Sequence, residues 1–319
     1  MSWFPLTLIV GFFVLAPWVL GAWVGLREPT SRLHWGVKCV VIVSFMLALW
    51  HTAGWHIVGT PFRWVGLAAT VVSIVWSARR LPDLDWWSDQ LWPTGVVVIG
   101  LFALSVFLSV RAGRLIASGR LSEGAVAVDL AFPFQEGSYY VVSGGTEPVG
   151  NPHMKVLTSD EWPDYTGQGY ALDLVRLNRW GMRASGLSPM DRRAYAIYGT
   201  PVHAPCSGPV VGARGDLPDY DPPDQDLDQK AGNYVVVACG DARVVLAHLK
   251  QGSLEVSEGD EVETGDLLAE IGNSGKTSEP HLHIHAQTPA EQGFFMSGRP
   301  RHVRFDGEFL SQTDVVEAQ

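Results

Sequence analysis

Positive charge is scarce in this sequence of 319 residues, in which 23 Lys and Arg stand against 33 Asp and Glu, a formal net charge of −10. Proteins that bind nucleic acid need an excess of Lys and Arg to neutralise phosphates, so this balance argues against a nucleic-acid partner. Charged residues make up only 18% of the chain, whereas hydrophobic residues make up 47% and 13 residues are Trp. This composition excludes a disordered chain, a collagen-like repeat and a coiled coil.

The charges divide the chain into two parts. Residues 1–124 hold nine Lys and Arg and five Asp and Glu, a net charge of +4. Residues 125–319 hold 14 Lys and Arg and 28 Asp and Glu, a net charge of −14. Because the length also allows about two domains, we expect two parts of different kinds.

The first part contains four uncharged stretches, of which the third, 64–78, is short unless the helix begins near Pro61 and Arg63 extends to the interface. The first, from Phe4 to Leu26, has 23 residues without charge, and a helix needs about 20 apolar residues to cross the hydrocarbon of a bilayer. Trp residues cluster at the ends of these stretches, where amphipathic rings favour the membrane–water boundary. A secretory signal peptide fits less well because three more apolar runs follow the first. We therefore predict a transmembrane domain over residues 1–115 with four helices, at about 4–26, 37–57, 61–79 and 91–112.

The charges in the loops do not define the orientation of these helices. With the N-terminus outside, five Lys and Arg would lie inside and four outside, which barely engages the positive-inside rule. Four helices would place both ends of the domain on the same side of the membrane.

The pattern changes after residue 125 to short β-branched runs separated by Gly, Pro and Asp, which is typical of an all-β domain. We predict a linker at 116–135, a β domain at 136–310 and a tail at 311–319. The segment 216–229 contains six Asp and three Pro, and we interpret it as a solvated acidic loop because it lacks the ligand spacing of an EF-hand. The stretch 256–271 is expected to form a hairpin. The predicted strands are 139–143, 170–176, 201–204, 209–213, 233–238, 243–249, 267–271 and 281–287.

The sequence has three cysteines. Cys39 falls in a predicted membrane helix and is most simply a small apolar residue. Cys206 and Cys239 lie at the ends of predicted neighbouring strands. In an oxidising compartment they would pair and close a loop around the acidic segment, and otherwise they are two free thiols.

Three of the ten histidines fall within five residues, where His281, His283 and His285 alternate with Leu282 and Ile284. Side chains alternate faces along a strand, so the three imidazoles project to one side. Neighbouring imidazoles on that face stand about 7 Å apart, so one can bind a metal while the next acts on the bound water. A chance polar face or a pH-sensing row is the other interpretation.

A zinc ion in a hydrolytic site takes three protein ligands and leaves its fourth position to water. Asp173 lies in an otherwise apolar predicted strand, and a buried carboxylate needs a cation or hydrogen-bond donors as a partner. The other interpretation of Asp173 is a strand-end residue bonded to backbone N–H groups. His248 also lies among aliphatic residues, where a core histidine is the simpler interpretation.

These residues carry a resemblance to a known family. The sequence Gly-Asn-Ser-Gly at 272–275, followed by Glu-Pro-His-Leu-His at 279–283, closely resembles the C-terminal motif of the lysostaphin/LytM-type zinc metallopeptidases. Ala-His-Leu at 247–249 looks like the second motif of that family, and Asp173 matches the Asp of its first motif. The resemblance covers about 150 residues, with the motifs in the right order.

The resemblance implies an antiparallel β groove, of the barrel-sandwich hybrid type, that holds one zinc ion and hydrolyses peptide cross-links of bacterial peptidoglycan. Carried over by position, Asp173 and His283 are metal ligands. His248 and His281 then flank the attacking water and the scissile carbonyl, where one of them accepts a proton. Because His ligands must be neutral, activity and metal affinity are expected to fall together below about pH 6.

The same resemblance implies a location. Peptidoglycan lies outside the cytoplasmic membrane, so the β domain of this multi-pass bacterial membrane protein is expected on the extracytoplasmic side, with the N-terminus outside. That compartment favours the disulfide between Cys206 and Cys239. The implied partners are the lipid bilayer and the peptides of peptidoglycan.

One motif position departs from the family. The first motif has a His four residues before its Asp, and Gly169 stands there in this chain. Two histidines are candidates to replace it: His153, from a loop that precedes the strand, and His285, which shares a face with His283. We favour His153 as the third ligand.

Two other functions compete with the hydrolase. A degenerate member of the same fold would bind wall peptides or regulate another hydrolase, and Gly169 supports that alternative. Residues 256–266 also resemble the hairpins of biotinyl/lipoyl-type carrier and adaptor domains. Those domains have no use for three His on one strand, and no Lys occupies the tip of this hairpin.

Overall fold

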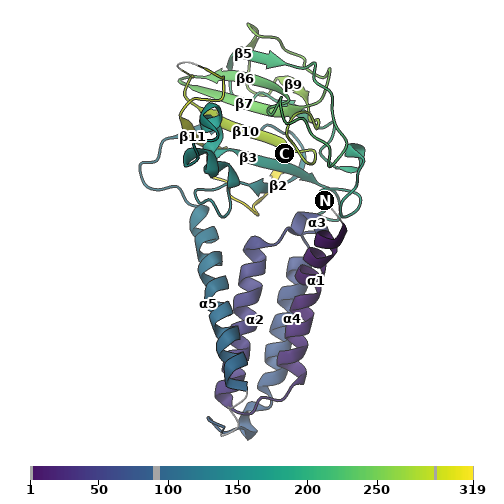
Figure 1. The fold of residues 1–319 in the computed structure, drawn as a ribbon, viewed down its shortest axis with the longest axis vertical. Helices are drawn as coiled ribbons and strands as arrows, with labels where there is room; N and C mark the ends of the chain where they lie inside the picture. Colours follow the sequence, from purple (N-terminus) through teal and green to yellow (C-terminus); the bar gives the residue numbers. More distant parts are fainter. Residues whose placement is uncertain (1–2, 89–93, 291–292, 319) are drawn as a thin grey trace. The chain divides into compact units, whose positions relative to one another are not determined.

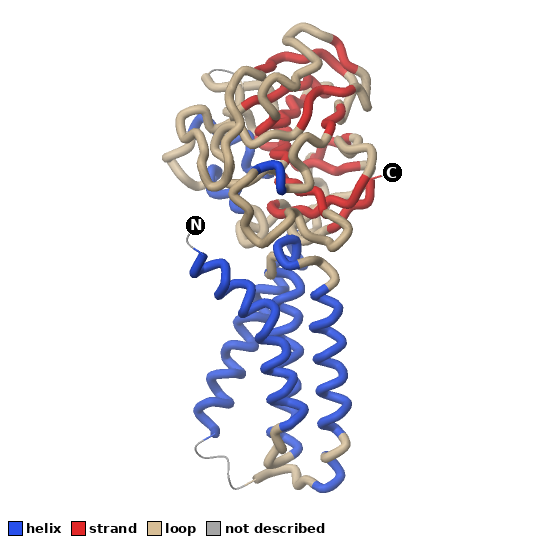
Figure 2. The backbone as a smooth tube through the Cα atoms, turned by 90° about the vertical axis from the view of Figure 1, so that its right-hand side faces the viewer, coloured by secondary structure: helices blue, strands red, loops and turns tan. Residues whose placement is uncertain are grey.

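The computed structural model describes residues 3–88, 94–290 and 293–318. The chain divides into two compact units, Met1–Ile116 and Ala117–Gln319. The long helices belong to the first unit and the strands to the second (Figure 2). The division lies next to the boundary predicted at residue 115.

The first unit is helical, and its helix α1 packs along α4 and α2 (Figure 1). The hydroxyl of Ser31 accepts a hydrogen bond from the His34 N–H, so α2 begins earlier than the predicted residue 37. The predicted helix at 37–57 is interrupted before Gly54, and the short α3 follows. Of the helix predicted at 91–112, residues 91–93 lie outside the described residues. The helices are α1 Trp3–Leu26, α2 Arg32–Thr52, α3 Trp55–Val58, α4 Phe62–Ala78, η1 Leu81–Asp83 and α5 Thr94–Ser118.

Within the described residues, one helix, Arg32–Thr52, is long and apolar enough to cross a membrane. The apolar helical segments Val14–Leu26 and Phe62–Ala78 are shorter. This finding is consistent with a membrane anchor near the N-terminus, and the arrangement of four spanning helices stays a prediction.

The second unit is built on a large sheet. Its strands run in the order β12-β2-β3-β10-β7-β6-β5-β8, with β11 beside β10 and β1 beside β11 (Figure 1). The pairs are antiparallel, as predicted, except for the parallel pair β1–β11. The strands β4 and β9 form a separate two-stranded antiparallel sheet. The strands are β1 Ala127–Leu130, β2 Gly137–Ser143, β3 Leu172–Leu177, β4 Pro201–His203, β5 Gly208–Arg214, β6 Asn233–Cys239, β7 Ala242–Leu249, β8 Glu261–Val262, β9 Leu267–Glu270, β10 Leu282–Gln287, β11 Pro300–Phe305 and β12 Val315–Ala318.

The hydrophobic core lies between the two sheets. Leu174 of β3, Leu246 of β7 and Ile284 of β10 are fully buried there, together with Val202 of β4 and Leu268 of β9. Because side chains alternate along a strand, the neighbours of these residues in β3 and β10 point to the opposite face of the large sheet. That second face is where polar side chains of the three central strands meet.

Four features differ from the prediction, and the first is β11, which lies at 300–305 where no strand was predicted. The strand β1 lies inside the predicted linker 116–135, and β12 lies inside the predicted tail 311–319, because each pairs with a strand distant in sequence. The predicted hairpin at 256–271 does not form as such, since β8 pairs with β5 and β9 pairs with β4. Short segments of this kind become strands through their partners, which local sequence does not reveal.

Cys206 and Cys239 are joined by a disulfide, with Cα atoms 5.8 Å apart. Cys239 ends β6, and Cys206 precedes β5, the neighbour of β6 in the sheet. The bridge encloses the acidic segment 216–229, which contains none of the helices or strands and is a loop, as predicted. Cys39 is a free thiol.

Candidate active site

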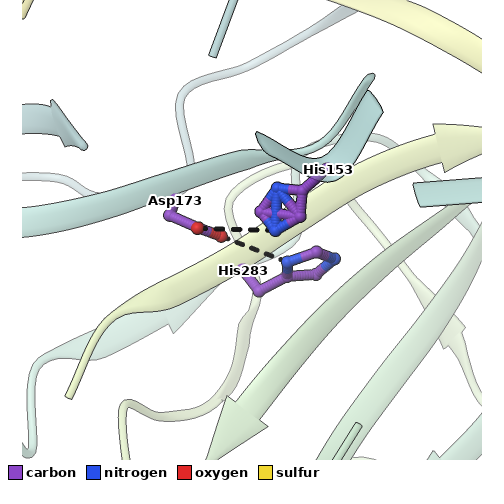
Figure 3. Close-up of side chains that lie close together, drawn as sticks. All are labelled: His153, Asp173 and His283. Carbon is purple, nitrogen blue, oxygen red and sulfur yellow. Dashed lines mark hydrogen bonds and ion pairs between the residues drawn. The ribbon is translucent and has the colours of Figure 1, made fainter. Parts of the chain in front are cut away.

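The centre of the site comes from two adjacent strands. Asp173 of β3 and His283 of β10 are direct partners in the antiparallel ladder, so their side chains leave the same face of the sheet side by side. His283 Nδ1 lies 3.1 Å from Asp173 Oδ1 (Figure 3). The alternation of β10 explains this position, because Leu282 and Ile284 enter the core on the other face.

His153 reaches the same place from outside the sheet. It lies in the 3-10 helix η2, Pro152–Leu157, and its Nε2 is 3.5 Å from Asp173 Oδ2 (Figure 3). The helix sits on Gly169, where a Cβ would lie 2.5 Å from Leu157 Cδ2. The absence of a side chain at 169 therefore makes room for Leu157, and η2 carries His153 into the cluster.

The three side chains fit a zinc ion. One potential ligand atom from each of His153, Asp173 and His283 lies within 4.8 Å of the others. Ligands of a tetrahedral zinc ion at about 2.0–2.1 Å stand roughly 3.3 Å apart. Each histidine lies at about that distance from one oxygen of Asp173, His283 at 3.1 Å from Oδ1 and His153 at 3.5 Å from Oδ2. Two imidazoles and a carboxylate, with a fourth position left open, form the donor set of hydrolytic zinc sites.

A β-bulge places His248. Along the β6–β7 pair the register steps from Tyr234↔Ala247 to Asn233↔Leu249, so His248 is the extra residue of β7. Its φ of +65° lies in the left-handed region, which costs a residue with a side chain about 1–3 kcal/mol. The bulge sets the His248 ring 4.8 Å from the His281 ring and 5.9 Å from the His283 ring, between centroids.

Carbonyl groups hold the rings of His248 and His281 in one tautomer. His248 Nδ1 lies 2.8 Å from the Ser274 carbonyl oxygen, and His281 Nδ1 lies 2.9 Å from that of Glu279. A carbonyl only accepts hydrogen bonds, so each Nδ1 carries a proton, and the tautomer with that single proton has its lone pair on Nε2. His281 Nε2 lies 3.6 Å from Asp173 Oδ1, and both rings can therefore accept a proton next to the cluster.

His285, the third histidine of this segment, contacts His283 on the side away from Asp173. Gln287 donates from Nε2 to the Phe295 carbonyl, so its Oε1 accepts from His285 Nε2, 3.3 Å away. His285 Nδ1 then accepts from His283 Nε2 at 3.0 Å. This series of hydrogen bonds leaves His283 Nδ1 with a lone pair that faces the Asp173 carboxylate. Such an arrangement needs a metal ion or a proton between the two atoms. His285 is completely buried and does not line the pocket, so the structure favours His153 as the third member.

Burial governs the charges of this cluster. Burial lowers the pKa of His153 to about 4 and holds those of His248 and His285 well below their usual range, with neighbouring histidines adding to the effect. Burial on its own would raise the pKa of Asp173, but His281, His153 and His283 outweigh it and keep that pKa well below its usual range. At neutral pH His153 is thus a neutral imidazole and Asp173 an ionised carboxylate, the forms that bind a metal.

The cluster opens into a pocket of about 330 Å³. Its walls include five of the six side chains that the sequence analysis proposed for the site, namely His153, Asp173, His248, His281 and His283, and leave out His285. Sequence analysis missed the other polar residues of the wall. The GNSG motif did mark one of their segments, since Lys276 and Thr277 follow it directly, but nothing marked Trp162, Tyr165 or Lys230.

Residues 193–293 match the model of Peptidase family M23. The matched segment contains His248, His281 and His283, whereas His153 and Asp173 precede it. No curated protein matches the chain.

Several solved structures are similar to the chain. They include the catalytic domain of the antimicrobial peptidase lysostaphin from Staphylococcus simulans, with 22% identity over 41% of this chain and 74% of that one and a TM-score of 0.27. A zinc-containing peptidase from Vibrio cholerae is 19% identical over 56% and 39% of the two chains, with a TM-score of 0.31. Csd3 from Helicobacter pylori is 15% identical over 60% and 36%, with a TM-score of 0.29. This chain thus spans less than half of the latter two proteins.

The family match covers the segment with the C-terminal and second motifs. It confirms the resemblance on which the sequence analysis relied. Residues 193–293, a segment of the β unit, thus match peptidase family M23.

Proposed function

We propose that the β unit is a zinc metallo-endopeptidase that hydrolyses peptide bonds of bacterial peptidoglycan. His153, Asp173 and His283 would hold one zinc ion. The observation that carries the proposal is the convergence of these three ligand atoms within 4.8 Å of one another. Two further imidazoles with free Nε2 atoms stand beside them, in a unit that contains an M23 domain.

The bound ion would supply an acidified water and polarise the scissile carbonyl. His248 and His281 are the candidates for the proton chemistry at Nε2: one of them would accept the proton of the attacking water and later return it to the leaving amine. The carbonyls of Ser274 and Glu279 fix the ring orientations through Nδ1. The ring centroids are 4.8 Å apart, so both imidazoles face the same small volume.

His153 completes the site in our proposal, and zinc binding by the full-length chain tests this. The zinc affinity of His153→Ala should fall by at least tenfold, with loss of peptidoglycan digestion, because the ion would keep only two protein ligands. His203→Ala serves as the matched control, since His203 lies on β4 and is not part of the pocket wall. A purified wild-type chain that binds no zinc at neutral pH would contradict the proposal.

A non-catalytic protein of the same fold is the second candidate function. It would bind wall peptides or regulate another hydrolase, and Gly169, at the position of the family's first His, is the observation that favours it. A peptidoglycan digestion assay separates the two functions. Zinc-loaded chain that binds the wall without releasing fragments would establish the second.

For the first unit we propose four membrane-spanning helices that anchor the β unit on the extracytoplasmic side of a bacterial cytoplasmic membrane. Large apolar side chains on the outer surfaces support a lipid environment: Val72 of α4 is 66% exposed and Phe107 of α5 is 61% exposed. The disulfide fits an oxidising compartment. A membrane-impermeant thiol reagent should label Glu258→Cys, at an exposed turn, in intact cells. Labelling only after lysis would refute this orientation.

A further inference from the structure

Two lysines lie on the wall of the pocket beside one indole ring. Lys230 Nζ is 4.1 Å from the centroid of the Trp162 ring and 4.8 Å from that of Tyr165. Lys276 Nζ is 4.8 Å from the same Trp162 ring. All four side chains line the pocket that contains Asp173 and its histidines. The aromatic faces hold both ammonium groups by cation–π attraction without neutralising their charge.

The main chain fixes this pair in place. The N–H of Lys276 donates to the carbonyl of Lys230 at 2.9 Å, although 46 residues separate them. Gly275 and Gly232 have positive φ, and a Cβ on either would overlap backbone atoms across this contact. The close approach of two glycine-containing segments therefore brings both lysines to one side of the pocket.

These two charges lack a carboxylate partner. Residues 125–319 contain four Lys within a net charge of −14, and two of the four line this pocket. Among the residues that the structure describes, neither Lys230 nor Lys276 forms an ion pair, whereas Lys250 pairs with Glu270. An acidic unit that concentrates unpaired positive charge on one pocket wall attracts an anionic group there.

The pair is also adjacent to the proton-transferring histidines. Ala231 follows Lys230, and its carbonyl accepts the His248 N–H at 3.2 Å. Thr277 follows Lys276, and its Oγ1 lies 3.1 Å from His281 Nδ1. The segments that carry the two lysines therefore also contact both histidines.

We propose that Lys230 and Lys276, supported by Trp162 and Tyr165, form a subsite for a carboxylate of the peptide substrate, close to the scissile bond. This inference rests on the proposed peptidase function. The subsite would select peptides with a free carboxylate over peptides in which that group is an amide, because only the carboxylate gains from two ammonium groups.

A pair of substrates tests the subsite. Cross-linked peptide dimers from peptidoglycan, with free carboxylates, are compared with the same dimers after carbodiimide amidation, using the full-length chain in detergent. We expect the KM of wild type to be about tenfold lower for the carboxylate form. A factor of about ten corresponds to the free energy of one partly exposed charge-assisted hydrogen bond. Lys230→Gln and Lys276→Gln should each reduce this preference at least threefold. Lys250→Gln, which removes the same charge outside the pocket, should keep it.

A measurement of binding without hydrolysis separates the proposed subsite from the proposed peptidase function. Fluorescence anisotropy with labelled dimers and metal-free chain should show the same preference and the same dependence on the two lysines. If wild type cleaves neither form but binds the carboxylate form in this way, the peptidase proposal fails and the subsite stands. Equal binding of both forms by wild type, or an unchanged preference in both lysine variants, would overturn the subsite even if cleavage is observed.

Discussion

The helical unit and the β unit differ in how their functions depend on individual residues. In the helical unit, apolar side chains such as Val43, Val72 and Phe107 are exposed on the helix surfaces, and another apolar residue of similar size would serve as well. In the β unit, Asp173 and His283 are opposite each other on adjacent strands, and each offers one potential ligand atom to the cluster. The first unit thus depends on composition along a helix, whereas the second depends on single side chains.

The largest effect is expected from Asp173→Asn. The amide keeps the shape of the carboxylate but loses its charge, so the site would lose its only anionic ligand. We expect peptidoglycan hydrolysis to fall by at least about 10³-fold, with loss of zinc from the purified chain. The assay is release of soluble wall fragments at equal protein concentration. Activity within tenfold of wild type would show that Asp173 does not bind the metal.

The matching test in the helical unit is Val43→Asp. Val43 is 49% exposed and lies near the middle of α2. A carboxylate there should make membrane insertion less favourable by about 3 kcal/mol, whereas Val43→Leu should leave insertion unchanged. The measurement is the inserted fraction of the α2 segment in a glycosylation reporter. Equal insertion of the Asp and Leu variants would mean that α2 is not a spanning helix.

A smaller effect is expected from His285→Leu, which removes the hydrogen bond to His283 Nε2 without touching the pocket. Without that acceptor, His283 can place its proton on Nδ1 and lose the lone pair that faces Asp173. Zinc affinity should fall about 10- to 100-fold. Competition with a chelator of known affinity measures the change. The same affinity in the Leu variant would show that His285 only fills space.

The smallest effect concerns pH. Burial lowers the pKa of His153 to about 4 from an unfolded value near 6.5. Between these values the unfolded chain binds more protons than the folded chain, so stability is lost as the pH falls. For the metal-free chain we expect His153 to contribute a loss of about 1 kcal/mol per pH unit between pH 6 and 5. Denaturant unfolding of wild type and His153→Gln checks this, and an identical pH dependence would contradict it.

Part of the site follows from sequence alone. Alternation along β10 puts His281 and His283 on the face opposite Leu282 and Ile284, and Asp173 is conspicuous as a carboxylate in an apolar strand. These patterns are local, with a period of two residues, and they do not depend on which strands become neighbours.

The remainder depends on contacts between distant segments. His153 enters because Leu157 packs on Gly169, and His248 is displaced by a bulge that no local pattern marks. His285 shares a face with His283 but bonds to its Nε2 instead of lining the pocket. The strands β1 and β12 and the pairing of the two pocket lysines likewise arise from tertiary contacts.

The central claim is that one metal ion is bound by two imidazoles and one carboxylate from this chain. X-ray absorption at the zinc edge of the zinc-loaded full-length chain tests it most directly. We predict a four-coordinate ion with two imidazole ligands and oxygen ligands at about 2.0–2.2 Å, and one imidazole fewer in His153→Ala. A spectrum with a single imidazole in wild type, or one that His153→Ala leaves unchanged, would contradict the account.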